Sequence, residues 1–162
     1  MFVIRKDNSV VLSPSKIQYV ADNALTIIAL FILMLAIGYD NAIVRIFSIA
    51  STVFLGFVLV YKWLLMKSIK WHITNEQIIY IRGVLNKQVN YIELYRVFDY
   101  REYQTFIEQL ISTKKIIIFS GDKSHPKLSL FGINQKDDVV TLIRERVEIN
   151  KQVKRVYEIS NK

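Results

Sequence analysis

Two strongly apolar stretches without a charged residue, 23–39 and 46–61, follow each other with only six residues between them. A helix that spans a bilayer needs about 20 mostly apolar residues, with a lower limit near 17. The first stretch reaches that length only with its uncharged flanks, and the second reaches it when Arg45 and Lys62 extend to the two interfaces. The pattern therefore predicts a two-helix transmembrane hairpin over residues 23–66.

A soluble helical hairpin and a cleaved signal peptide are the alternatives for this region. A soluble helix carries a polar stripe, and residues 25–37 have none. A signal peptide ends at a small-residue cleavage site, whereas here a second apolar run follows at once. Both alternatives are less consistent with the pattern than a membrane hairpin.

Aromatic and basic residues flank the apolar stretches, as is typical of membrane–water interfaces. The interface candidates are Tyr39, Arg45, Lys62, Trp63, Lys67 and Lys70. Basic residues also precede the first stretch, at Arg5, Lys6 and Lys16. The connecting loop offers only Arg45, which Asp40 partly balances, so we expect both termini to be cytoplasmic.

After residue 67 the pattern changes to short β-rich runs bounded by turn residues. These runs are residues 69–74, 77–82, 87–92, 115–119 and 127–131. A segment dense in aromatic and charged residues, 94–103, lies between the third and fourth runs. The apolar spacing over residues 105–111 predicts a short helix.

The last predicted element is an amphipathic helix. Asn134 is a good N-cap, and Asp137, three residues later, completes a capping-box pattern. The apolar stripe consists of Val139, Val140, Ile143 and Val147, and Arg144 and Arg146 are expected away from it. The fold class is therefore α+β, with a helical hairpin followed by a curled antiparallel sheet or barrel that a C-terminal helix caps.

Motifs within residues 65–148 resemble the bacterial pleckstrin-homology-like (PH-like) domain that is found next to transmembrane helices. The matching positions are Thr74, Ile78, Gly83, Ile92, Leu94, Arg96, Val97 and Asp99. Gln77 stands where the family usually has Arg, and the segment 106–112 lacks the family's usual Gly. The resemblance implies a membrane-tethered module of the bacterial inner membrane that binds a protein or another ligand.

The expected organisation has four parts. Residues 1–22 form a cytoplasmic N-terminal segment, 23–66 the hairpin, 67–149 the PH-like domain, and 150–162 a charged tail. In eukaryotic relatives of the fold a basic first hairpin loop binds phosphoinositides. The corresponding turn here, residues 74–76, has no Lys or Arg, so the sequence does not support such a site.

The composition of the chain limits the activities and ligands that can be expected. The chain has 162 residues, a formal net charge of +8, two histidines and no cysteine. Neither His72 nor His125 has the spacing of a metal or hydrolytic site, so we expect no enzyme activity, no metal and no cofactor. A basic domain beside an anionic leaflet is attracted to the membrane surface. The basic residues are scattered among acidic residues, which argues against nucleic-acid binding.

The aromatic segment is the candidate partner surface. Its proposed members are Tyr95, Arg96, Tyr100, Arg101 and Tyr103. Tyr and Arg dominate hot spots for protein partners, and they can also stack a nucleotide base. Since one strand has two faces, the alternative is that some of these rings fill the core.

These observations favour a non-enzymatic, membrane-anchored scaffold whose domain recruits a protein partner or forms a homo-oligomer. The first alternative is a signal-gated, membrane-disrupting effector of antiviral defence, whose β-domain would bind a cyclic nucleotide. This alternative rests on analogy of architecture. A subunit of a larger membrane machine is a further alternative.

Overall fold

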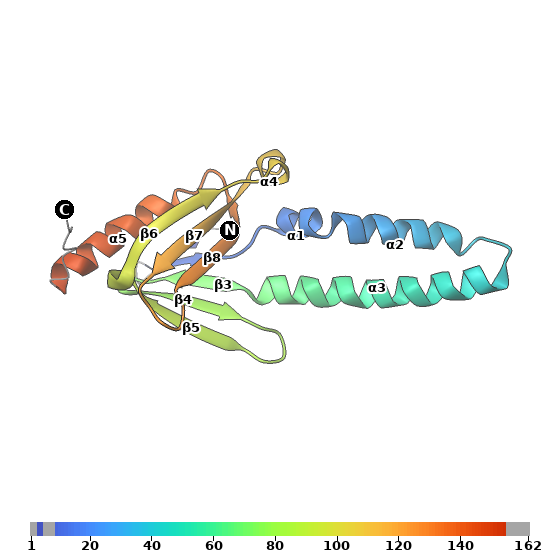
Figure 1. The fold of residues 1–162 in the computed structure, drawn as a ribbon, viewed down its shortest axis with the longest axis horizontal. Coiled ribbons are helices and arrows are strands. Elements are labelled where there is room, and N and C mark those ends of the chain that lie inside the picture. Colours follow the sequence, from blue (N-terminus) through green and yellow to red (C-terminus); the bar gives the residue numbers. More distant parts are fainter. Residues whose placement is uncertain (1–2, 5–8, 155–162) are drawn as a thin grey trace.

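The computed structural model describes residues 3–4 and 9–154 and consists of a β-domain from which a long helical hairpin projects (Figure 1). The hairpin is built from α1 (Lys16–Asp22), α2 (Ala24–Ala36) and α3 (Ala42–Ser68). The helix α2 packs antiparallel beside α3 along its length (Figure 1). Asn41 caps α3, because its side-chain oxygen accepts from the backbone N–H groups of Ile43 and Val44.

The β-domain contains two antiparallel sheets. The first sheet has the order β1-β2-β3-β4-β5 and the second the order β6-β7-β8. The strands of the first sheet are β1 (Val3–Ile4), β2 (Val10–Leu12), β3 (Lys70–Ile73), β4 (Gln77–Arg82) and β5 (Gln88–Glu93). A 3-10 turn, η1 (Leu94–Arg96), leads to β6 (Val97–Tyr103), β7 (Thr113–Ser120) and β8 (Lys127–Asn134).

The core lies between the two sheets and α5 (Val139–Val153). Its largest side chain is the fully buried Trp71, which stacks on Tyr80 at 6.1 Å and meets the edge of Phe131 at 5.4 Å. Buried residues alternate along β3, β7 and β8, and further buried apolar residues come from β2, β4, β5, η1, β6 and α5. Burial of alternate strand positions from both sheets accounts for the curled, closed shape of the domain.

The strand β2 joins the first sheet from the part of the chain that precedes the hairpin. Val10 pairs with Ile73, and Leu12 pairs with Trp71. Residues 1–22 were predicted to be a separate segment, because a run of three residues is too short to be recognised as a strand. The hairpin is thus inserted between two neighbouring, hydrogen-bonded strands of the same sheet.

The short helix was predicted correctly and is α4 (Phe106–Leu110), with a complete capping box between Thr105 and Glu108. The predicted run 127–131 is too short, because β8 continues through Gly132 to Asn134. Gly132 adopts a positive φ of 63°, and a side chain there would lie 3.1 Å from Gln18. Glycine is required at this position because β8 passes directly against α1.

Two details of the C-terminal helix were also predicted wrongly. Asp138, not Asn134, is the N-cap of α5, and its side chain accepts from the backbone N–H of Thr141. The Asn134 side chain instead accepts from Lys136 in the preceding turn. Arg146 does not point away from the domain, because it donates to two backbone carbonyls of the β3–β4 turn.

The apolar stripe of α5 is as predicted, with Val139, Ile143 and Val147 buried and Val140 packed against the core. The helix continues to Val153, so it includes the first residues of the predicted tail. Arg5 and Lys6, which entered the orientation argument, and residues 155–162 of that tail lie outside the described residues.

Candidate functional site

Polar side chains join α1 to α3 where the hairpin meets the β-domain. The Lys62 ammonium donates to the side-chain oxygen of Asn23 at 3.0 Å, and the Tyr19 hydroxyl donates to the carbonyl of Leu59 at 2.7 Å. The Trp63 ring meets the Tyr19 ring edge-on at 5.2 Å. This cluster fixes the crossing of the two helices at the base of the hairpin.

Three of the six predicted interface residues lie at this base. Lys62 and Trp63 belong to the cluster, and the Lys67 ammonium lies 5.9 Å from the centroid of the Trp63 ring. Lys70 follows at the start of β3 and is exposed. Tyr39 and Arg45 are exposed at the opposite end of the hairpin. Aromatic and basic residues therefore mark both ends of the apolar helices, as interfacial residues do.

The hairpin exposes most of its apolar side chains. Large exposed apolar residues occur along both α2 and α3, among them Leu25, Phe31, Ile43, Phe47, Phe54 and Phe57. Of the described helices, α3 alone is long and apolar enough to cross a membrane. The helices α1 and α2 meet that condition only together, and they are bent by 65° at Asn23.

At the opposite end of the domain, η1 carries the first of two clusters of rings and cations. The guanidinium of Arg96 donates to the Tyr95 hydroxyl at 3.0 Å and pairs with Asp122 at 3.5 Å. Lys154 lies 4.5 Å from the centroid of the Tyr95 ring and 4.0 Å from the Glu93 carboxylate. The hydrogen bond to Tyr95 raises the pKa of Arg96, so this cation remains charged.

The second cluster is centred on Phe119 of β7. Arg101 and Lys127 each lie 5.8 Å from the centroid of the Phe119 ring, and the exposed Phe98 ring lies 6.4 Å from it. The predicted candidate surface lacks Phe119, Lys127 and Lys154, because these residues come from β7, from β8 and from the C-cap of α5. Their juxtaposition follows from strand pairing, which the aromatic segment alone does not reveal.

The structure therefore divides the predicted partner surface. Tyr95, Arg96 and Arg101 belong to the two clusters, while Tyr103 is exposed farther along β6, toward α4. Tyr100 is different, because its ring packs against the core. The alternative that some rings fill the core thus applies to Tyr100.

Tyr100 lies beside a cavity of about 250 Å³ between β6 and α5, which Arg144, Glu148 and Lys151 also line. The Tyr100 hydroxyl is buried and has no hydrogen-bond partner among the residues that the structure describes. Burial raises the pKa of Tyr100 to about 12, so its phenol is neutral at physiological pH.

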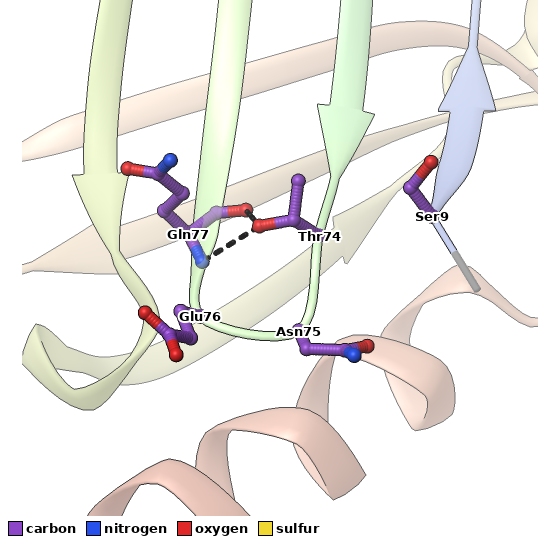
Figure 2. A pocket seen from close by; sticks show the side chains of 5 residues that line it. All are labelled: Ser9, Thr74, Asn75, Glu76 and Gln77. Carbon is purple, nitrogen blue, oxygen red and sulfur yellow. Dashed lines mark hydrogen bonds between the residues drawn. The ribbon is translucent and has the colours of Figure 1, made fainter. Parts of the chain in front are cut away.

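The β3–β4 turn forms another cavity, of about 340 Å³, with Ser9 at the start of β2 (Figure 2). The Thr74 hydroxyl closes the turn, since it accepts from the backbone N–H of Gln77 at 3.0 Å and donates to its carbonyl at 2.8 Å. Arg146 and Asn150 of α5 donate to backbone carbonyls of the same turn. Among the residues that the structure describes, the cavity lining includes Asn75 and Glu76 and no Lys or Arg.

Metal ligands are not gathered anywhere in the described part of the chain. Over residues 3–4 and 9–154, no group of three or more His, Asp or Glu side chains is placed to hold a metal ion. The candidate functional features are therefore surfaces: the apolar hairpin and the two ring–cation clusters.

The architecture defines an α+β protein in which PH-like antiparallel sheets and a C-terminal helix are joined to an apolar helical hairpin. The chain belongs to the bacterial PH domain family, whose model matches residues 23–147. The matched range includes α2, α3, the strands from β3 to β8 and α5 as far as Val147, whereas β1, β2 and α1 precede it. The search of curated proteins found no match, and neither did the search of solved structures.

Proposed function

We propose that this protein is a non-enzymatic binding module of the bacterial inner membrane, anchored by the helical hairpin, with its PH-like domain in the cytoplasm. The apolar, outward-facing surface of α2 and α3 supports the anchor, because a soluble protein rarely exposes so large a contiguous apolar area. Membership of a PH-like family favours binding over catalysis.

The pairing of β2 with β3 is the observation that carries the proposal. Residues 10–12 and 71–73 are hydrogen-bonded neighbours, although the whole hairpin lies between them in the sequence. Both strands must therefore lie on the same side of a membrane, and the chain between them must cross it an even number of times. Since α3 is suited to one crossing, α1 and α2 together are expected to supply the other.

The dimensions of the hairpin support this arrangement. From Arg45 to Lys62, α3 rises about 26 Å at 1.5 Å per residue, close to the ~30 Å of a hydrocarbon core. The long side chain of Arg45 makes up part of the difference by reaching the head groups, while Lys62 donates to Asn23 at the base of the hairpin. The 13 residues of α2 rise only about 20 Å, so the returning arm needs the turn and part of α1.

The two ring–cation clusters support a partner surface that faces the cytoplasm. The start of β6 and the C-terminal end of α5 lie at the end of the domain farthest from the hairpin (Figure 1). Exposed aromatic residues together with arginine are typical of binding hot spots. We infer that a protein partner binds this distal end, where neither the hairpin nor a bilayer obstructs it.

Topology can be tested with accessibility labelling, because the chain has no cysteine. Single variants Asp40→Cys and Glu145→Cys would be treated with an impermeant maleimide in intact spheroplasts and again after permeabilisation. We expect Asp40→Cys to react in intact cells and Glu145→Cys only after permeabilisation. Reaction of both in intact cells, or extraction of the protein by alkaline carbonate, would contradict the anchor.

Partner binding can be tested by photo-crosslinking in cells. A photoreactive residue at Phe98 should capture one protein in stoichiometric yield, and the same residue at the exposed Thr141 is the matched control. Capture at both positions or at neither would argue against a distal partner surface. Release of a bound cyclic nucleotide from the purified protein would instead favour the effector alternative.

A further inference from the structure

The short helix α4 is amphipathic in the opposite sense to a normal surface helix. Its two largest apolar side chains, Phe106 and Leu110, are 74% and 70% exposed, whereas the carboxylate residue Glu108 is only 7% exposed. The Glu108 carboxylate accepts from the backbone N–H and the hydroxyl of Thr105, at 2.8 and 3.0 Å. Glu108 is thus used in the capping box of α4 itself, while the apolar side chains of Phe106 and Leu110 are presented outward.

The β4–β5 turn presents a second apolar tip. Leu85 is 89% exposed, and Val84 beside it is also exposed. The turn is held in place because the backbone N–H of Gly83 donates to the Ser68 hydroxyl, at the C-terminal end of α3, at 3.0 Å. This bond fixes the level of the turn relative to the hairpin.

Both tips lie at the level of the hairpin base. Figure 1 shows α4 beside α1, and the light green β4–β5 turn alongside the C-terminal end of α3. The contact between α4 and α1 makes the apolar surface continuous, because Ile17 and Val20 of α1 are exposed as well. Both tips therefore lie beside the base of the hairpin.

We propose that α4 and the β4–β5 turn insert into the head-group layer of the membrane that holds the hairpin, so that the β-domain is docked on the bilayer in one fixed orientation. This inference rests on the proposed anchor. Ser68 lies six residues, or about 9 Å, beyond Lys62 along α3, and a head-group layer is about 5–8 Å thick. Ser68 itself thus lies just beyond that layer, but the β4–β5 turn reaches past the C-terminal end of α3 toward the hairpin (Figure 1), which brings its apolar residues to the depth where Phe and Leu partition into an interface.

Charge complementarity favours lipid as the occupant of these tips. Exposed basic residues surround the β4–β5 turn and the hairpin base, namely Lys67, Lys70, Arg82 and Lys87. Each basic residue near an anionic leaflet contributes roughly 1 kcal/mol of attraction. A bilayer would bury the apolar tips and would also pair the surrounding basic residues with anionic head groups.

Site-directed fluorescence on the full-length protein tests the inference. Single variants Leu85→Cys and Leu110→Cys would carry an environment-sensitive fluorophore in vesicles of phosphatidylethanolamine and phosphatidylglycerol. The control variants are Phe57→Cys, on the exposed face of α3, and Glu145→Cys, on the exposed face of α5. Quenching by nitroxides attached at the lipid head group or along the acyl chain would report depth.

The expected result is a blue-shifted emission at Leu85 and Leu110 that head-group nitroxides quench, with acyl-chain quenching at Phe57 and none at Glu145. Water-like emission at Leu85 and Leu110, with Phe57 still quenched by acyl chains, would overturn the docking and leave the anchor intact. Loss of quenching at Phe57 would instead overturn the anchor. A blue shift at Leu85 and Leu110 that disappears on dilution of the protein in lipid would assign the tips to a second copy and would also overturn the inference.

Discussion

Lys62 and Asn23 join the two arms of the hairpin, with the Lys62 ammonium 3.0 Å from the side-chain oxygen of Asn23. Asn23 is buried, and its amide group also donates to the carbonyl of Tyr19, at 2.9 Å. The residue at the break between α1 and α2 therefore links three helices. Lys62 is thus held by a polar partner within the protein and is not simply extended toward water.

Replacement of Asn23 by Leu should weaken this junction. The change removes a hydrogen bond to a charged group, which contributes about 1.5–3 kcal/mol, so we expect the free energy of unfolding in detergent micelles to fall by about 1–2 kcal/mol. Lys62→Met should have a similar effect, and the double variant should lose less than the sum. Strict additivity in this double-mutant cycle would show that the pair does not interact.

Two arginines on α5 should differ sharply in their contribution to stability. Arg146 donates to the carbonyls of Ile73 and Thr74, at 2.7 and 3.0 Å, whereas Arg144 makes only an exposed ion pair with Glu148. Arg146→Met should lower the free energy of unfolding by about 2–4 kcal/mol, because two carbonyls lose a charged donor. Arg144→Met should change it by less than about 0.5 kcal/mol. Chemical denaturation in micelles checks both, and equal effects would contradict the structure.

Tyr100 should make the protein sensitive to high pH. Its pKa rises from 10.0 to about 12 because of burial, so the folded state keeps a proton that the unfolded state releases. Stability should be unaffected below about pH 10 and should fall as the pH rises from 10 to 12. Tyr100→Phe should remove that part of the pH dependence and leave stability at neutral pH unchanged or higher. Denaturation of the unmodified protein and of Tyr100→Phe across this pH range measures the difference in their free energies of unfolding. The same pH dependence in both proteins would contradict the prediction.

Gly83 should not tolerate a side chain. Its φ is 118°, and a Cβ atom would lie 1.9 Å from the carbonyl oxygen of Asn86. Gly83→Ala should cost about 1–3 kcal/mol and should displace the β4–β5 turn. Gly56→Ala is the matched control, because nothing lies within 4 Å of a Cβ atom at that position of α3. Thermal unfolding would distinguish the two variants, and an unaffected Gly83→Ala would disprove the strained turn.

Much of the β-domain could be predicted from alternation of side chains. The run 77–82 coincides with β4, and the other predicted runs overlap β3, β5, β7 and β8 within a few residues. The strand β2 was missed because three residues carry almost no periodic signal, and its pairing depends on a partner about 60 residues away. The N-cap of α5 was placed at Asn134 because Asn and Asp cap helices equally well, and local sequence does not distinguish them.

The candidate surface could be predicted only in part, since its members are brought together by tertiary pairing. Tyr95, Arg96 and Arg101 were identified because they are neighbours in the sequence. Phe119 was placed in the predicted strand 115–119 and not in the candidate surface, although Arg101 and Lys127 each lie 5.8 Å from the centroid of its ring. Strand register determines which face a ring occupies, and a shift of one residue reverses the face. This is also why Tyr100 could not be assigned to the core beforehand.

The position of the hairpin between β2 and β3 has a consequence for how the protein is made. During synthesis β2 leaves the ribosome before either long helix, but its pairing partner emerges only after both. On the proposed topology, the first sheet is completed only when the second helix has returned to the cytoplasmic side. Until then β3 exposes an unpaired edge, which is a target for proteolysis and aggregation. Completion of the sheet would thus act as a check on correct insertion, and chains with a single crossing would be removed before they accumulate.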